Sequence, residues 1–294
     1  MTAKSKGILA ILMSAFGFAL MAFFVRLCDF YGGEVSSFQK SFFRNLIAFF
    51  IAGSIFLGEA RRDGELKKSI AKYSKKAWAL LTLRSVGGAF GIFGNFYALS
   101  HIPIGEGMTL NKTSPFFAVL FSWLFLRERA KLSNLLWLVI AFTGAVLVMK
   151  PGFAGDDTFA TLCALGGGLG AGIAYTCVRE LGVMKVNGAF IVLFFSAFST
   201  LASVPFMIAN GIDAMTSAQI VIMLLAGAGA AIGQFGVTAA YRFAPPKEIA
   251  VFDYSNVVFT ALLGFAFLPE HQIPDALSAF GFVLILFAAL KSRH

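Results

Sequence analysis

Apolar stretches of about 20 residues follow one another along almost the whole chain, each long enough to cross the ~30 Å hydrocarbon core of a bilayer as a helix. Short polar connections separate most of these stretches, and the longest connection is Gly58–Lys76. The pattern predicts an all-α integral membrane protein with ten transmembrane helices. They are expected at residues 7–27, 35–57, 77–99, 104–126, 133–149, 159–179, 187–209, 217–241, 247–268 and 274–291.

The composition agrees with this pattern, because 58% of the residues are apolar and only 13% are charged. Of the 24 Lys and Arg residues, eighteen lie in the terminal segments, in Gly58–Lys76 or in every second connection after it. The other connections hold only Arg26 and Lys150. Basic residues collect in cytoplasmic loops, so both termini are predicted to be cytoplasmic, and Asp156 and Asp213 external. We expect a bacterial inner (plasma) membrane, and the net charge of +9 then reflects topology rather than a nucleic-acid partner.

The stretch 84–128 recurs at 226–270 without a gap, at a shift of 142 positions. A fainter match at a shift of 153 relates Val25-Arg26 to Val178-Arg179. Each half contains five predicted spans, and this odd number inverts the second copy in the membrane. We therefore predict two inverted five-helix repeats, 1–150 and 151–294, that form one transport unit with a site near the midplane. The matched residues include Gly87, Gly91, Gly94, Pro103 and Glu106 in the first copy and Gly229, Gly233, Gly236, Pro245 and Glu248 in the second.

Five ionisable side chains lie inside the predicted spans: Lys40, Arg44, Arg84, Lys112 and Asp253. Such groups are costly in hydrocarbon and are candidates for function. Lys40 is expected to snorkel to the external boundary. Arg84 and Asp253 lie at similar depth, so Arg84 either pairs with Asp253 or contacts a substrate. Arg44 and Lys112 lie near mid-bilayer without an assigned counter-charge.

Pro115 is predicted to break the fourth helix, because proline has no N–H to bond the carbonyl of Asn111. We expect a bend at Asn111–Pro115 with Lys112 facing a central cavity. The second copy has Val257 in place of the proline, so its helix is expected to be straighter. At the shift of 142, Asn111 and Lys112 correspond to Asp253 and Tyr254. The predicted substrate-binding set is Arg44, Arg84, Asn111, Lys112, Asp253, Tyr254, Ser255 and Asn256.

Other residues give little indication of catalysis or cofactor binding. The histidines lie in loops or at the terminus, without metal-ligand or nucleophile spacing. The cysteines show no disulfide or metal pattern. The glycine run Gly166–Gly172 lies within an apolar span, so we expect close helix packing and not a dinucleotide loop. No catalytic residue, metal or cofactor is predicted. The histidines in question are His101, His271 and His294, and the cysteines are Cys28, Cys163 and Cys177.

Two segments resemble the EamA family of the drug/metabolite transporter superfamily: "FYALSHIPIGEGMTLNKTSPFFAVLFSWLFLRER" and its partner "APPKEIAVFDYSNVVFTALLGFAFLPE". The matching features are Arg44 followed by Ala48, an aromatic-Ala-Leu turn before a proline, Pro115 within a helix, and Leu126-Arg127-Glu128. The resemblance implies ten helices, cytoplasmic termini, a central cavity and no use of ATP. Members of the family carry amino acids, nucleosides, vitamins and other metabolites, so the resemblance implies no single substrate.

These observations predict a secondary transporter that moves a small polar metabolite by alternating access. Unpaired Arg44 and Lys112 favour an organic anion or an amino acid as substrate. The alternative is that burial deprotonates Lys112, which would then couple protons to the export of neutral or cationic metabolites or drugs. An intramembrane enzyme lacks a catalytic constellation, and a passive channel or packing subunit leaves the buried cations unexplained. The pattern predicts no particular oligomeric state.

Overall fold

The computed structural model describes residues 1–64, 70, 72–152, 157–268 and 274–293. The predictions for Lys67, Lys68, Asp156, His271 and His294 lie outside these residues. Within the described part, eight helices are long and apolar enough to cross a membrane, and one further apolar helix is shorter. The elements are α1 (Ala3–Asp29), α2 (Ser37–Arg62), α4 (Lys75–His101), α5 (Ile104–Asn111), α6 (Ser114–Leu126), α7 (Leu132–Met149), α8 (Thr158–Val183), α9 (Gly188–Asn210), α10 (Ser217–Phe243), α11 (Pro246–Ile249), the 3-10 helix η1 (Ala250–Tyr254), α12 (Ser255–Phe267) and α13 (Ala276–Ser292).

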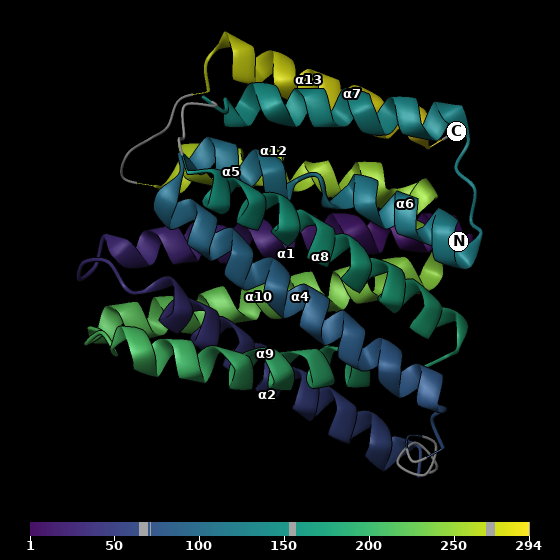
Figure 1. Ribbon diagram of the computed structural model, residues 1–294, viewed down its shortest axis with the longest axis horizontal. Helices are drawn as coiled ribbons and strands as arrows, with labels where there is room; N and C mark the ends of the chain where they lie inside the picture. The colour runs from purple at the N-terminus through teal and green to yellow at the C-terminus, as the bar shows by residue number, and fades with distance from the viewer. Residues whose placement is uncertain (65–69, 71, 153–156, 269–273, 294) are drawn as a thin grey trace.

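The helices lie side by side in a bundle, with α7 and α13 along one edge and α2 and α9 along the other (Figure 1). Both ends of the chain lie at the same end of the bundle. There the Lys4 ammonium donates hydrogen bonds to the carbonyl oxygens of Ser292 and Arg293, at 3.3 and 2.7 Å. We call this the terminal end of the bundle, and the other the opposite end.

Small residues hold the long helices at close range, because a helix backbone can approach another where no side chain intervenes. A methyl group added at Gly17 of α1 would lie 2.5 Å from the Gly233 nitrogen of α10. Similarly, a methyl group added at Gly170 of α8 would lie 2.5 Å from the Gly87 oxygen of α4. The same holds for Gly144 of α7 against α13, at 2.6 Å. The predicted packing role of these glycines is confirmed.

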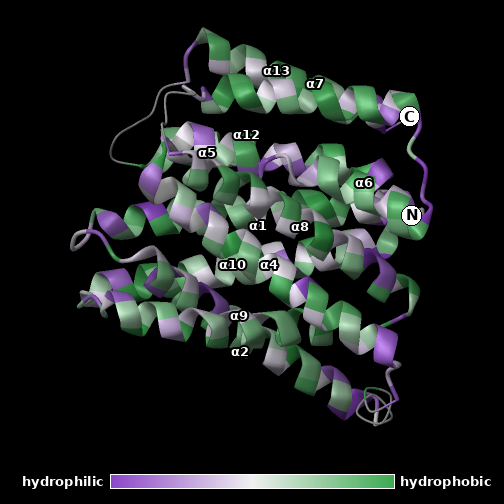
Figure 2. Ribbon diagram, in the orientation of Figure 1, coloured by the Kyte–Doolittle hydropathy of each residue, from purple (hydrophilic) through white to green (hydrophobic). Residues whose placement is uncertain are grey.

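The polar and apolar residues are distributed as a bilayer requires. Hydrophilic residues gather near the helix ends, and apolar residues cover most of the helix lengths (Figure 2). Large apolar side chains such as Phe125 and Leu201 are 72% exposed at the surface. In contrast, Arg44, Arg84 and Asp253 are buried. Lipid-facing surfaces are therefore apolar, and the ionisable groups lie inside the bundle.

Two of the predicted spans are discontinuous. The segment predicted at 104–126 divides into α5 and α6, with Lys112 and Thr113 between them. The segment predicted at 247–268 divides into α11, η1 and α12. The second segment stays helical from Pro246 to Phe267 and only changes its winding, with Ala250–Tyr254 as a 3-10 helix, so the expectation that it is the straighter stays a prediction.

Candidate functional site

The two discontinuities meet inside the bundle. The Lys112 ammonium lies 3.5 Å from Oδ2 of Asp253, which belongs to η1. The Tyr254 hydroxyl donates a hydrogen bond of 2.9 Å to the Lys112 carbonyl oxygen. That bond caps a carbonyl at the break, where a regular helix would supply an N–H. Pro115 is the second residue of α6, where its missing N–H leaves no helical bond unmade.

Arg84 does not pair with Asp253, so that predicted ion pair is wrong. Instead its Nη2 donates a hydrogen bond of 2.8 Å to Oε1 of Gln234 on α10. The guanidinium carbon lies 3.5 Å from the ring centroid of Phe195 on α9, a cation–π contact. Asp253 faces Lys112 instead. The prediction failed because two side chains at a similar depth in the membrane need not lie on the same side of a bundle.

The other cations have different surroundings. The guanidinium of Arg44 lies 5.9 Å from the Phe18 ring centroid, and its Nε has no hydrogen-bond partner. Lys40, expected to reach the external boundary, forms an ion pair of 2.6 Å with the carboxylate of Asp29, the last residue of α1. The expectation that Lys112 lacks a counter-charge is also wrong, because Asp253 supplies one. Arg44 and Arg84 are thus the two buried cations that have no carboxylate in ion-pair range among the described residues.

Three other predicted site residues bridge helices or lie at helix ends. Asn256 donates a hydrogen bond of 3.0 Å to the Ala15 carbonyl of α1. The side chain of Asn111 lies against Gly167 of α8. Ser255 is the buried first residue of α12. The predicted set therefore divides into a cluster at Lys112, Asp253 and Tyr254, a separate cluster at Arg84, and Arg44 beside Phe18.

Two rows of uncharged polar residues were missed by the sequence reasoning. On α9, Ser196, Ser199 and Thr200 are buried, and their hydroxyls have no partner within the described part of the chain. On α10, Gln234 and Thr238 are four residues apart and share a helix face, which Arg242 continues one turn further. The helical spacing of these residues within apolar spans was the available signal. The uncharged residues in the predicted set came only from the neighbourhood of Lys112 and its counterpart at the shift of 142.

A cavity of about 220 Å³ lies at the terminal end between α2, α9 and α10. Thr238 and Ala189 are buried in its wall, and Glu59 is exposed. Thr238 is one helical turn from Gln234, the partner of Arg84. The lining residues are Ile55, Glu59, Asn187, Gly188, Ala189, Phe235, Thr238, Ala239 and Arg242.

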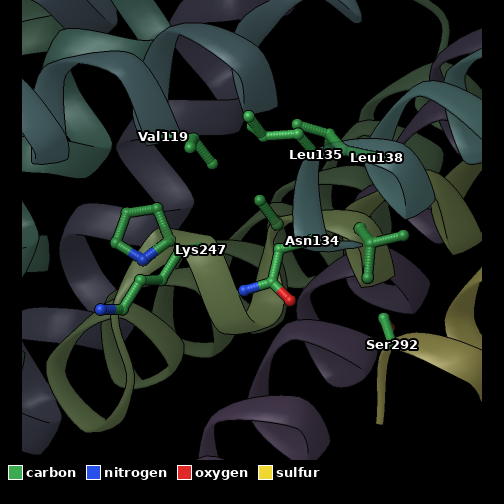
Figure 3. Close-up of a pocket in the computed structure, with 9 residues that line it drawn as sticks. Val119, Asn134, Leu135, Leu138, Lys247 and Ser292 are labelled. Carbon is green, nitrogen blue, oxygen red and sulfur yellow. The ribbon is translucent and has the colours of Figure 1, made fainter. Parts of the chain in front are cut away.

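A second cavity lies among α6, α7, α11 and α13, also near the terminal end, and Val119, Asn134, Leu135, Lys247 and Ser292 help to line it (Figure 3). Its volume is only about 10 Å³. A volume of that order is about the smallest that can hold one water molecule. This cavity therefore has no room for a metabolite.

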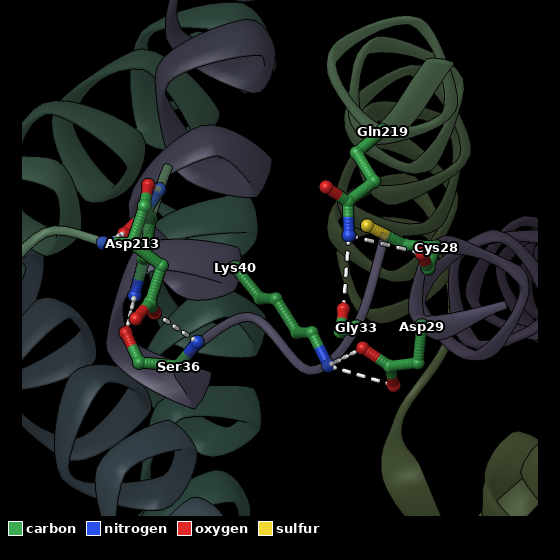
Figure 4. A network of polar contacts seen from close by, with 8 residues as sticks. Cys28, Asp29, Gly33, Ser36, Lys40, Asp213 and Gln219 are labelled. Atoms are coloured by element: carbon green, nitrogen blue, oxygen red, sulfur yellow. Dashed lines mark hydrogen bonds and ion pairs between the residues drawn. The ribbon is translucent and has the colours of Figure 1, made fainter. Parts of the chain in front are cut away.

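The opposite end is held together by a polar network (Figure 4). The Ser36 amide donates a hydrogen bond of 2.7 Å to the Asp213 carboxylate, which ties the start of α2 to the α9–α10 loop. Gln219 of α10 donates a bond of 2.9 Å to the Gly33 carbonyl. The Lys40–Asp29 ion pair joins α2 to α1.

An aromatic cluster lies near that end as well. Phe38 of α2 stacks on Phe206 of α9 with ring centroids 5.2 Å apart, and Phe93 of α4 contacts both rings. The rings and the polar network together join five helices, α1, α2, α4, α9 and α10. The 220 Å³ cavity thus lies at the terminal end, and these contacts join the helices at the opposite end.

Comparison with known proteins assigns the family. Residues 5–150 match the EamA-like transporter family. The chain belongs to this family. The resemblance noted in the sequence is thereby confirmed, and the chain is a transporter-family protein and not an enzyme.

Similar family members include proteins of named activity. The chain is 29% identical over 285 residues to the pseudopaline exporter CntI of Pseudomonas aeruginosa, covering 97% of this chain and 94% of that protein. It is 28% identical over 192 residues to the riboflavin transporter of Brucella anthropi, covering 64% of this chain and 67% of that protein. A solved crystal structure matches with a TM-score of 0.81 and 18% identity, covering 98% of each chain. That likeness concerns the fold alone.

Within the described residues, no three His, Cys, Asp or Glu side chains lie close enough together to share a metal ion. The polar groups that the bundle buries are instead guanidinium, ammonium, carboxylate, amide and hydroxyl groups. Groups of these kinds can form hydrogen bonds and charge interactions with a polar solute.

Proposed function

We propose that this EamA-like transporter is a secondary transporter that moves a small organic anion or amino acid by alternating access. The observation that carries the proposal is that Arg44 and Arg84 are buried without a carboxylate partner. A buried charge is costly unless it is compensated, and a bound carboxylate or phosphate would compensate it. Arginine can bind either group through two parallel hydrogen bonds. The pseudopaline exporter and the riboflavin transporter, named for small molecules, support the general activity.

We propose further that residues 1–150 and 151–294 are inverted five-helix repeats. The paired packing supports this, because Gly17 on α1 contacts α10 at Gly229 and Gly233, while Gly170 on α8 contacts α4 at Gly87 and Gly91. These two sets are counterparts at shifts of 153 and 142. Tyr254 is the counterpart of Lys112 and bonds to it directly. Only residues on a twofold axis touch their own counterparts, so the axis would pass between Lys112 and Tyr254.

The two ends of the bundle differ in a way that suits alternating access. At the shift of 153, the counterparts of Phe206 and Phe38 are Gly53 and Ile191. Phe38 and Phe206 thus have smaller counterparts, but the terminal end holds aromatic contacts of its own, where Phe190 of α9 meets Phe56 of α2 and Trp78 of α4. What distinguishes the terminal end is the 220 Å³ cavity. We assign this conformation to the state that is open toward the terminal end. From the charge bias, that end faces the cytoplasm of a bacterial inner membrane.

A counterflow assay in liposomes tests the anion proposal, because it needs no ion gradient. Arg44→Gln and Arg84→Gln are each expected to raise the KM for a carboxylate substrate about tenfold or more, the effect of losing a charged hydrogen bond. Arg62→Gln, at the exposed end of α2, serves as the control and is expected to leave KM unchanged. The anion proposal fails if either buried variant keeps the wild-type KM, or if the protein carries only cations.

Proton coupling at Lys112 and Asp253 is the second candidate, and neutral or cationic metabolites would then be possible substrates. The observation that favours it is the position of this ion pair at the junction of two broken helices. Protonation of Asp253 would weaken its hold on Lys112 and allow the halves to move. Lys112→Gln would then keep counterflow but lose accumulation driven by a pH gradient. Loss of both activities, or of neither, contradicts the coupling role.

A further inference from the structure

The cavity at the terminal end carries two opposite charges that do not meet. Glu59 of α2 and Arg242 of α10 both line it, and no ion pair joins them within the described part of the chain. The Asn187 side-chain amide donates a hydrogen bond of 2.7 Å to Oε2 of Glu59 and holds that carboxylate at the cavity wall. Both charges therefore line a space large enough for a small solute.

Arg242 and its neighbour on α10 have unused hydrogen-bonding capacity. The Nε of Arg242 and the hydroxyl of Thr238 are buried without partners. Both residues line the cavity, one helical turn apart. Gly188 leaves room for the guanidinium, because a methyl group added there would lie 2.5 Å from its Nη1. Both atoms lie behind the cavity surface, so a negatively charged ligand that accepts hydrogen bonds would satisfy them after a rotation of the two side chains.

We infer that this cavity is a binding subsite for the zwitterionic head of an amino acid, with the carboxylate toward Arg242 and Thr238 and the ammonium toward Glu59. At about 220 Å³ it is smaller than the pockets of ~300–1,000 Å³ that enclose drug-sized ligands, so it suits a head group and not a large molecule. The row Arg242, Thr238 and Gln234 then leads from the subsite to Arg84. This inference rests on the proposed transport of an anion or amino acid and adds a separate binding site for the substrate at the terminal end.

Thiol modification tests the subsite without any transport measurement. A single cysteine at Ala239, in a chain whose native cysteines are replaced by alanine, reports on the cavity in purified protein. The modification rates by an anionic and by a cationic methanethiosulfonate reagent are compared, with and without glycine. Arg242→Gln is expected to lower the anionic-to-cationic rate ratio severalfold, and Glu59→Gln is expected to raise it. A reference cysteine at Lys75, outside the cavity lining, should show neither change.

Glycine is expected to slow both reagents at position 239 more than acetate or methylammonium does at equal concentration, because only glycine satisfies both charges. Thr238→Val should weaken that protection severalfold. The inference is overturned if glycine protects no better than the two half-ligands, or if neither charge substitution changes the rate ratio. Glu59 is exposed, so its variant keeps the test valid if Arg242→Gln fails to fold. Protection without counterflow would contradict transport and leave the subsite standing.

Discussion

Replacing Lys112 alone should destabilise the protein far more than replacing Lys112 and Asp253 together. The two charges are 3.5 Å apart, and their side chains are 16% and 7% exposed. At an effective dielectric constant of about 20, that separation corresponds to an attraction of about 5 kcal/mol. Removing one partner leaves the other as an uncompensated buried charge, which costs about 3–5 kcal/mol. Replacing both by apolar residues removes the desolvation cost along with the attraction and is often close to neutral.

The measurement is the free energy of unfolding in mixed detergent micelles, for Lys112→Met, Asp253→Leu and the double variant. Each single variant is expected to lose about 3–5 kcal/mol and the double variant less than either. The same cycle at Lys150 and Asp275, where the pair is exposed, should give a much smaller coupling. If the losses of the two single variants simply add in the double variant, then no buried ion pair stabilises the junction and the reasoning is refuted.

Three further outcomes follow from the packing, the loop charges and the topology. Gly144→Ala should cost about 1–3 kcal/mol of unfolding free energy, because the new methyl would press on the α13 backbone, whereas Gly264→Ala, with no atom nearer than 3.7 Å, should cost none. A hydrogen bond from Lys150 lowers the pKa of Asp275 to about 2. Its contribution to stability is therefore present above the unfolded pKa of about 4 and lost as the pH falls from about 4 to 2, and thermal unfolding of Asp275→Asn should lack that pH dependence. An impermeant thiol reagent should label a cysteine at Ile212 in intact cells but not one at Lys75; the reverse pattern would invert the proposed orientation.

Part of the candidate site could be predicted from the sequence, because an ionisable residue inside an apolar span can be recognised without a structure. Arg44, Arg84, Lys112 and Asp253 were found in this way, and all four are shielded within the bundle. Their partners could not be found, because hydropathy gives the depth of a residue and not the side of the bundle that it faces. Depth alone suggested Asp253 as one of two possible partners of Arg84, and the structure gives it Gln234 instead.

The role of uncharged polar residues is also hard to predict from the sequence. Ser196, Ser199 and Thr200 are common residue types in membrane helices, where a hydroxyl can bond to its own helix backbone. Their sequence spacing therefore does not distinguish packing from binding. Only the neighbouring helices reveal that these three hydroxyls are buried without partners.

The sequence by itself determined the properties that depend on order along the chain. These are the apolar spans, the charge bias between alternate connections, the match at a shift of 142 and the break near Pro115. They follow from sequence because a bilayer imposes one length and one polarity profile on every helix that crosses it. The tertiary structure alone decided the pairing of Lys112 with Asp253, the closure at Phe38 and the cavity beside Arg242. Those depend on helix rotation and neighbours, which side-chain packing sets and which no periodicity in the chain records.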